Sequence, residues 1–157
     1  MNKITPCLWF DNQAEEAAQY YTTIFKNSRI VEVVRYGEAG PGPVGSVMVV
    51  DFLLDGQQFT ALNGGPIFTF NEAISLVVHC QTQAEVDELW EKLTAGGKPG
   101  QCGWLKDRYG VSWQIVPTAL LEMMTDKDPV KAQRATAAML QMTKPDIAAA
   151  RRAFEGA

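Results

Sequence analysis

Hydrophobic and polar positions along the first half of the chain predict four strands arranged around one helix. Four short apolar or β-branched runs favour strands: residues 4–10, 28–36, 46–54 and 57–63. The last two runs are separated by Asp55-Gly56, a dipeptide typical of tight hairpins. Residues 11–25 carry apolar side chains at helical spacing, with Asp11 or Asn12 as the expected N-cap. The predicted order is therefore strand, helix, strand, strand, strand.

The second half repeats this order in a shorter form. Apolar runs at 74–80 and 111–117 predict its first and last strands, and residues 82–97 predict a helix capped by Thr82. The tripeptide Gln13-Ala14-Glu15 recurs 70 positions later, and Gly56 recurs as Gly110 after 54 positions. The smaller second offset indicates that the middle strands of the second copy are shortened. Two matches in the same order indicate a duplicated module.

After residue 117 the pattern is helical throughout. Asp128 is followed by Pro129 and predicts a capped helix start, and Pro145 is expected to open another helix in the same way. We therefore predict an α+β fold in two β-α-β-β-β modules, with domain limits of 1–66 and 67–117 for the modules and 118–157 for a C-terminal helical extension. Four of the six methionines lie in the extension, and we expect them to pack against the chain's own sheet rather than dock a partner.

Composition narrows the possible partners. The 14 basic and 18 acidic residues give a net charge of −4, which argues against nucleic-acid binding. The apolar runs are too short to cross a membrane, and the N-terminus lacks a signal-peptide pattern. We expect a cytoplasmic protein. Its three cysteines, in no Cys-x-x-Cys pair, are expected to be reduced and mostly buried.

Several segments resemble one known family. They are "CLWFDNQAEEAAQYYTTIF", "RYGEAGPG", "FTALNGGP", "FNEAISL" and "CGWLKDRYGVSWQIVP". Together with the paired modules, they resemble the PhnB-like branch of the vicinal oxygen chelate superfamily, which includes glyoxalase I, extradiol dioxygenases and bleomycin-resistance proteins. Members of this branch are often labelled demethylubiquinone methyltransferase-like. The resemblance implies a curved eight-stranded cup, often within a homodimer, and no single reaction.

The resemblance also indicates where a metal would bind. In metal-dependent relatives, His, Glu or Gln ligands come from the first and last strands of each module. The repeat places these positions at Thr5, Thr60, Ser75 and Gln114. Hydroxyl and neutral amide groups are poor ligands for zinc, iron or manganese. We therefore expect neither a metal nor another cofactor.

Strand alternation extends the candidate ligand-binding set. Cys7 and Trp9 share a face with Thr5, and His79 shares a face with Ser75. We favour a hydrogen-bonded structural role for His79 and a buried, inert thiol at Cys7 over catalytic roles. Asp51 is either a pocket carboxylate or, as we favour, a solvent-exposed one. The aromatic residues Phe59, Trp104 and Trp113 are predicted to be core residues.

The methyltransferase label can be tested on the residues. A cofactor-binding methyltransferase usually has a Gly-rich turn between a strand and a helix. The two Gly-rich loops, 40–45 and 63–66, contain proline and precede strand-like sequence. We predict no binding of S-adenosylmethionine.

Three functions remain open. The favoured one is a metal-free homodimer that binds a small molecule through Thr5, Cys7, Trp9, Thr60, Ser75, His79 and Gln114. The alternative is an enzyme of the superfamily (a lyase, dioxygenase or transferase-like protein) that uses the same cup, with His79 or a carboxylate as general base. The third is a protein-interaction module acting through the C-terminal helices.

Overall fold

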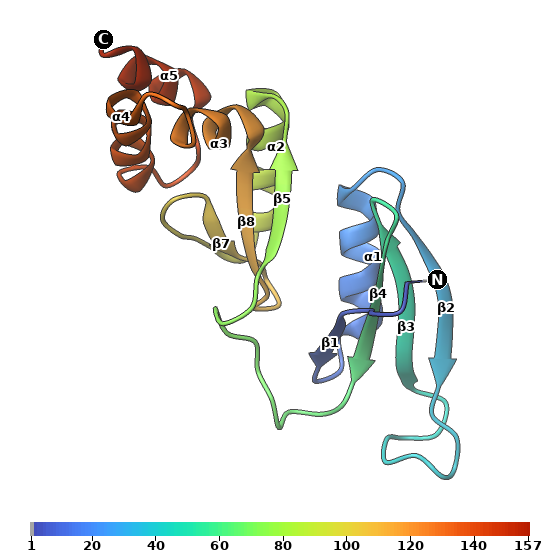
Figure 1. Ribbon diagram of the computed structural model, residues 1–157. Helices are drawn as coiled ribbons and strands as arrows, with labels where there is room; N and C mark the ends of the chain where they lie inside the picture. Colours follow the sequence, from blue (N-terminus) through green and yellow to red (C-terminus); the bar gives the residue numbers. More distant parts are fainter. Residues whose placement is uncertain (1) are drawn as a thin grey trace. The chain divides into compact units, whose positions relative to one another are not determined.

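The computed structural model describes residues 2–157 and divides the chain into two compact units (Figure 1). The first unit ends at Phe70, and the second runs from Asn71 to Ala157. Each unit contains one four-stranded sheet, and the C-terminal helices belong to the second unit. The α+β class and the two β-α-β-β-β modules are confirmed. The joining of both sheets into one eight-stranded cup stays a prediction.

The first sheet has the strand order β1-β4-β3-β2, with β1 parallel to β4 and the other pairs antiparallel. Its elements are β1 (Cys7–Phe10), α1 (Ala14–Ile24), β2 (Arg29–Arg35), β3 (Val47–Leu54) and β4 (Gln57–Asn63). The predicted hairpin between β3 and β4 is confirmed. Asp55 and Gly56 both have positive φ angles, of 48° and 77°, as this tight turn requires.

Helix α1 covers one face of the first sheet and buries Ala14, Ala17, Ala18 and Tyr21. The Tyr21 ring stacks on Phe52, with ring centroids 6.4 Å apart, and Phe52 stacks on Phe59 at 5.5 Å. All three side chains are buried. Each large apolar side chain removed from water contributes roughly 1.5–3 kcal/mol, so this aromatic stack is a major source of stability in the first unit.

The expected cap of α1 by Asp11 or Asn12 is wrong. The helix begins at Ala14, and the Ala14 N–H group donates to Oδ1 of Asn63 at 2.8 Å. The acceptor comes from the end of β4, 49 residues away, so local sequence could not reveal it. Asn63 Nδ2 also donates to the Val47 carbonyl. One side chain thus joins α1, β3 and β4.

The second sheet repeats the topology in the order β5-β8-β7-β6. Its elements are β5 (Leu76–Cys80), α2 (Gln83–Thr94), β6 (Lys98–Pro99), β7 (Trp104–Lys106) and β8 (Ser112–Pro117). The predicted shortening of the middle strands is confirmed. Thr82 is the predicted N-cap of α2, and its hydroxyl accepts from the Glu85 N–H group at 3.2 Å.

Three helices follow β8: α3 (Thr118–Met124), α4 (Pro129–Leu140) and α5 (Ile147–Glu155). Asp128 caps α4 as predicted, with Pro129 in the first turn. The expectation for Pro145 is wrong, because Asp146 caps α5 and Pro145 lies before the helix. A buried cluster holds these helices together: Leu120, Met123, Ala135, Met139 and Ala150. The methionines therefore pack inside the chain, mostly among the helices themselves.

The extension is fastened to the second module by hydrogen bonds as well. The Gln83 amide on α2 donates to the Pro145 carbonyl and accepts from the Ile147 N–H group, at 2.9 and 2.8 Å. The N–H groups of Cys102 and Gly103, before β7, donate to carbonyls of residues 142 and 143. The extension thus supports the module at the loop between its two shortest strands.

Candidate functional site

The face of the first sheet opposite α1, here called the α1-distal face, carries a row of polar side chains. On β4, Phe59 and Ala61 are buried, whereas Thr60 between them is half-buried on the opposite face. Thr60 lies directly between Cys7 on β1 and Asp51 on β3. Its hydroxyl donates to Asp51 Oδ1 at 2.7 Å. Directly paired residues share a face, so the three side chains form one continuous row.

Cys7 is exposed in this row, and the expectation that it is buried is wrong. Partial desolvation, followed by the negative charge of Asp51, raises the pKa of its thiol. A raised pKa keeps sulfur in the weakly nucleophilic thiol form at neutral pH. Burial, with a smaller effect of Glu85, raises the pKa of Cys80 to about 12. Both sites therefore disfavour thiolate chemistry.

Trp9 and Thr5 complete the predicted residues of the first unit. Trp9 lies on the α1-distal face, its indole N–H group donates to the Gly65 carbonyl at 2.9 Å, and its ring contacts Phe68 edge-on. Thr5 is half-buried and precedes β1. The strand register places Cys7, rather than Thr5, opposite Thr60. Thr5 is thus at the margin of the row.

The equivalent face of the second sheet, here called the α2-distal face, joins Ser75 to Gln114. The Gln114 amide donates to the Ser75 hydroxyl at 2.9 Å. Trp113 and Ile115, on either side of Gln114, are buried on the opposite face. The predicted alternation along β8 is therefore present in the structure. Ser75 and Gln114, two of the four positions at which metal-dependent relatives place ligands, are in direct contact.

His79 lies two residues beyond Val77 on β5, and Val77 pairs with Gln114. Alternation therefore places His79 on the α2-distal face, where its side chain is exposed. Within residues 2–157, no hydrogen bond or ion pair is formed by its imidazole. The predicted hydrogen-bonded structural role is not observed. A partnerless imidazole is available to a ligand.

The burial of two residues on these faces differs from the prediction made from the sequence. Trp104 was expected in the core, but it pairs with Gln114 and lies half-buried on the α2-distal face. Asp51 was favoured as solvent-exposed, but it is half-buried and accepts from Thr60. The available signal for Asp51 was a single carboxylate within the apolar run "VMVVDFLL".

Ser112 adds an unusual polar group. It lies two residues before Gln114 on β8, and its Oγ atom is buried without a hydrogen-bond partner in the described chain. Buried polar groups are nearly always satisfied, so this hydroxyl is an exception among the described residues, and its burial keeps it out of reach of a ligand on the α2-distal face.

The donor groups do not suit a transition metal. Across residues 2–157, no cluster of three His, Cys, Asp or Glu side chains could hold an ion. The groups at the positions used by metal-dependent relatives are the hydroxyls of Thr60 and Ser75 and the amide of Gln114, and they already bond to neighbouring side chains. Neutral oxygen donors of this kind bind zinc, iron or manganese weakly.

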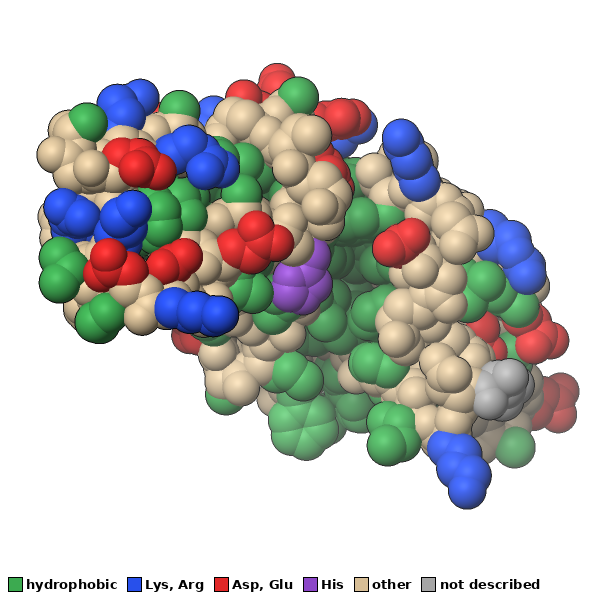
Figure 2. Space-filling model, turned by 45° about the horizontal axis from the view of Figure 1, so that its top comes forward, with side chains coloured by type: hydrophobic (Ala, Val, Ile, Leu, Met, Phe, Trp, Pro, Cys, Tyr) green, Lys and Arg blue, Asp and Glu red, His purple; other side chains and the backbone are tan. Residues whose placement is uncertain are grey.

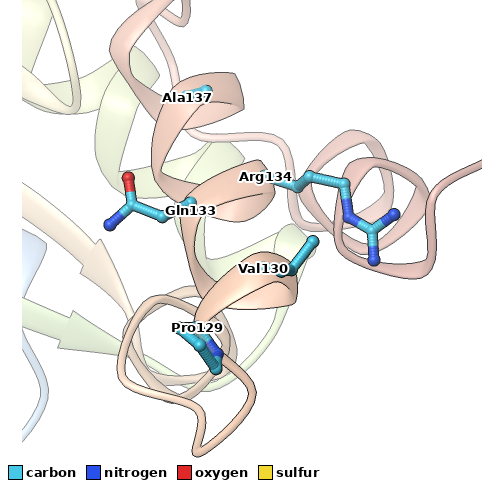
Figure 3. A pocket seen from close by; sticks show the side chains of 5 residues that line it. All are labelled: Pro129, Val130, Gln133, Arg134 and Ala137. Carbon is cyan, nitrogen blue, oxygen red and sulfur yellow. The ribbon is translucent and has the colours of Figure 1, made fainter.

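A shallow hollow on α4 is formed by five residues of that helix alone (Figure 3). Figure 3 shows Gln133 and Arg134 pointing to different sides of the helix, so the hollow is an open surface rather than an enclosed cavity. Around the C-terminal helices, acidic and basic side chains alternate without a large patch of one sign on the face seen in Figure 2. None of the described helices is long and apolar enough to span a membrane.

The strand order and the paired modules define the fold class as that of the vicinal oxygen chelate proteins. The family model described as 3-demethylubiquinone-9 3-methyltransferase matches residues 2–116, so the chain belongs to this PhnB-like family. The match ends just before α3, and the C-terminal helices lie outside it. Among curated proteins, none matches the chain significantly.

Three solved structures show the similarity. The PhnB protein from Bacillus cereus is 41% identical, covers 74% of this chain and 99% of its own, and has a TM-score of 0.68. Protein PA1353 from Pseudomonas aeruginosa is 20% identical, with 74% and 98% coverage and a TM-score of 0.61. The fosfomycin resistance protein FosX from Listeria monocytogenes, complexed with Mn(II) and sulfate, is 14% identical, with 74% and 89% coverage and a TM-score of 0.52. The last two show the fold alone.

Proposed function

We propose that this PhnB-like protein binds small, partly apolar molecules without a transition metal, and that the α1-distal face and the α2-distal face each supply binding residues within their own unit. The observation that carries the proposal is the hydrogen bond between Gln114 and Ser75. It puts an amide and a hydroxyl, both able to donate and accept, at the positions where metal-dependent relatives place ligands. Thr60 with Asp51 supplies a second polar pair. The binding set is Thr5, Cys7, Trp9, Thr60, Ser75, His79 and Gln114, extended by Trp104 and Asp51.

The side chains around the polar pairs support a partly apolar ligand. Trp9 and Trp104 lie half-buried on the two faces, and Val77 beside Gln114 is exposed. Ligand sites commonly combine such aromatic walls with a few polar groups that fix orientation. FosX is described as complexed with Mn(II), but the hydroxyl and amide groups of this chain do not reproduce a manganese ligand set.

The proposal is tested by a fluorine-detected fragment screen together with elemental analysis of the purified protein. We expect fragments that bind the wild type to lose at least tenfold in affinity in Gln114→Leu. They should bind equally well to Gln133→Leu, a matched change on the exposed face of α4. Unchanged binding in Gln114→Leu would reject the site, and one zinc, iron, nickel or manganese per chain would reject the metal-free assignment.

A methyltransferase activity is not supported by the two Gly-rich loops. The loop of residues 40–45 leads into β3, and residues 63–66 lead from β4 into a loop without a helix. Neither provides the strand-to-helix turn that commonly holds S-adenosylmethionine. We expect calorimetry to detect no micromolar affinity for this cofactor, and a micromolar titration would contradict the proposal.

We also propose that the protein is a cytoplasmic homodimer. Exposed apolar side chains are concentrated between residues 67 and 77, where Ile67, Phe68, Ile74 and Val77 are 47–75% exposed. Neighbouring exposed apolar side chains, such as Ile67 and Phe68 in the first unit, are typical of surfaces that bind another protein. Light scattering at tens of micromolar should give twice the chain mass of 17.3 kDa, and a monomer mass would reject the dimer.

A second candidate function, an enzyme using the same faces, rests on His79. An exposed imidazole without a partner can act as a general base when a substrate is placed beside it. If the protein is an enzyme of this kind, His79→Gln should lower turnover far more than it lowers fragment affinity, whereas Gln114→Leu should lower fragment affinity as described above. The third function, protein interaction through the C-terminal helices, has only the open hollow on α4 in its favour (Figure 3).

A further inference from the structure

A cavity of about 450 Å³ lies in the first unit, at the end where β1, β2 and β4 finish and α1 begins (Figure 1). It is formed by three segments far apart in the sequence: residues 11–15, residues 36–47 and residues 63–65. Two of these segments overlap the Gly-rich loops, residues 40–45 and 63–66, for which no role in binding S-adenosylmethionine is supported. The volume lies within the range of small-molecule sites. None of the residues proposed for ligand binding on the α1-distal face lines it.

The walls of this cavity are fixed by close contacts. The Tyr36 hydroxyl donates to the Asn63 carbonyl at 2.5 Å, and the same asparagine binds α1 and β3 through its side chain. The loop passes so near the Tyr36 ring that a Cβ atom at Gly40 or Gly42 would overlap it. The glycines are thus required for this approach. The cavity is built by the packing of the loop on Tyr36 rather than left by a loose loop.

Three polar side chains of the cavity lack a partner within the described chain, whereas those of Tyr36, Ser46 and Asn63 are hydrogen-bonded. Asp11 and Glu15 supply two carboxylates, and Asn12 supplies an amide. Among residues 2–157, none of these three side chains has a hydrogen bond or ion pair. No Lys or Arg lines the cavity, and Arg35 nearby donates instead to the Gly45 carbonyl outside it. Two unneutralised carboxylates therefore face one cavity.

The charged groups of the cavity determine whether its ligand is a cation or an anion. The N-terminus of α1 contributes a partial positive charge of roughly half a unit, and two full negative charges outweigh it. An anion would be repelled, whereas a cation would meet both carboxylates. Tyr36, Pro41 and Pro43 supply apolar parts of the remaining walls. They suit hydrocarbon rather than a hydrated metal ion.

We propose that this cavity binds a small organic ammonium compound, with its charged nitrogen between Asp11 and Glu15 and its carbon chain against Tyr36, Pro41 and Pro43. This cavity adjoins the α1-distal face, because Gly65 accepts from the Trp9 indole. The Gly42 amide and the Asp11 and Glu15 variants distinguish binding in the cavity from binding on that face. Because the carboxylates lie near the surface, salt screens their attraction, and millimolar affinity is expected for a minimal ligand.

The test uses butylammonium chloride as the probe, with sodium butyrate and 1-butanol as controls of the same carbon chain length. In ¹⁵N-resolved NMR spectra of the full chain, butylammonium should cause saturable shifts at the amides of Gly42, Gly64 and Gly65. Butyrate should cause none at these amides, and butanol should bind at least tenfold more weakly. Absence of saturable shifts up to about 50 mM butylammonium would overturn the proposal, as would equal shifts with butyrate.

Paired variants locate the site. Asp11→Asn combined with Glu15→Gln removes both charges at nearly constant volume and should weaken butylammonium binding at least tenfold. Glu16→Gln combined with Glu38→Gln removes the same charge from residues that do not line the cavity, and it should leave the affinity within twofold. Equal affinity in the two double variants would overturn the proposal. Circular dichroism checks that both remain folded, as expected for changes at exposed or half-buried positions.

Discussion

The two modules share one strand order, but different interactions stabilise them. The first has strands of up to eight residues and a stacked core of Tyr21, Phe52 and Phe59. The second has middle strands of two and three residues, and three additional helices pack beside it. The two modules therefore keep the same strand order although the first is stabilised mainly within its sheet and the second also by the C-terminal helices.

The turns before the last strands show the same divergence. In the first module, Asp55 and Gly56 form a two-residue hairpin with positive φ angles. Their N–H groups donate to the Ser28 hydroxyl and to the Asn27 carbonyl, both at 3.0 Å. In the second, the buried Asp107 carboxylate accepts from the N–H groups of Tyr109 and Val111 and from the Trp113 indole. The second turn depends on the carboxylate of Asp107, whereas the first combines positive φ angles with hydrogen bonds to Asn27 and Ser28.

The largest effect is expected in the appended helices. Leu120→Ala should lower the free energy of unfolding by about 2–5 kcal/mol, because it leaves a cavity in the cluster formed with Met123 and Met139. Leu121→Ala, at a neighbouring exposed position, should cost less than about 1 kcal/mol. Urea unfolding measures both. Equal values would mean that the extension does not stabilise the second unit.

The next largest change in stability is expected at the turn that contains Asp107. Asp107→Asn replaces one acceptor oxygen by a donor amide, so at least one of the hydrogen bonds from Val111 and Trp113, both buried, or from Tyr109 is lost, at a cost of about 2–3 kcal/mol. Asp55→Asn should change stability by less than about 0.5 kcal/mol, because asparagine tolerates a positive φ angle. Thermal denaturation compares the two variants. A cost at Asp55 equal to that at Asp107 would contradict the distinction between the turns.

The helix caps provide a smaller contrast. Thr82→Ala removes a local cap of α2 and should cost about 1 kcal/mol. Asn63→Ala should cost more, about 2 kcal/mol, because the side chain also binds the Val47 carbonyl and links three elements. Chemical denaturation can resolve this difference. A smaller loss for Asn63→Ala would show that the distant cap contributes little.

The smallest effect concerns Cys7. Removing the negative charge in Asp51→Asn should lower the pKa of the Cys7 thiol toward its ordinary value, because the thiolate is no longer repelled. Desolvation is the larger cause and remains, so the pKa of the Cys7 thiol should stay above its ordinary value. At a pH below the thiol pKa, alkylation of Cys7 by iodoacetamide should then become faster. Cys80 should stay unreactive in the folded protein, and a slower Cys7 reaction would contradict the assignment.

The sequence alone determined the architecture of both modules. The apolar periodicity, the Asp55-Gly56 hairpin and the Thr82 and Asp128 caps depend on neighbouring residues, and all are present in the structure. The repeat also assigned Phe59 and Trp113 to the buried faces, because a change of one residue in register would expose them. These features could be predicted because each depends on interactions between residues that are close together in the sequence.

Only the tertiary structure decided how distant side chains meet. The Asn63 cap of α1, the Thr60 to Asp51 pair and the Trp104 position beside Gln114 join residues whose neighbours in sequence carry no sign of the contact. The cavity between the two Gly-rich loops and the start of α1 likewise required three segments to come together. Such contacts depend on strand pairing across the sheet, which fixes side-chain partners that periodicity alone leaves undetermined.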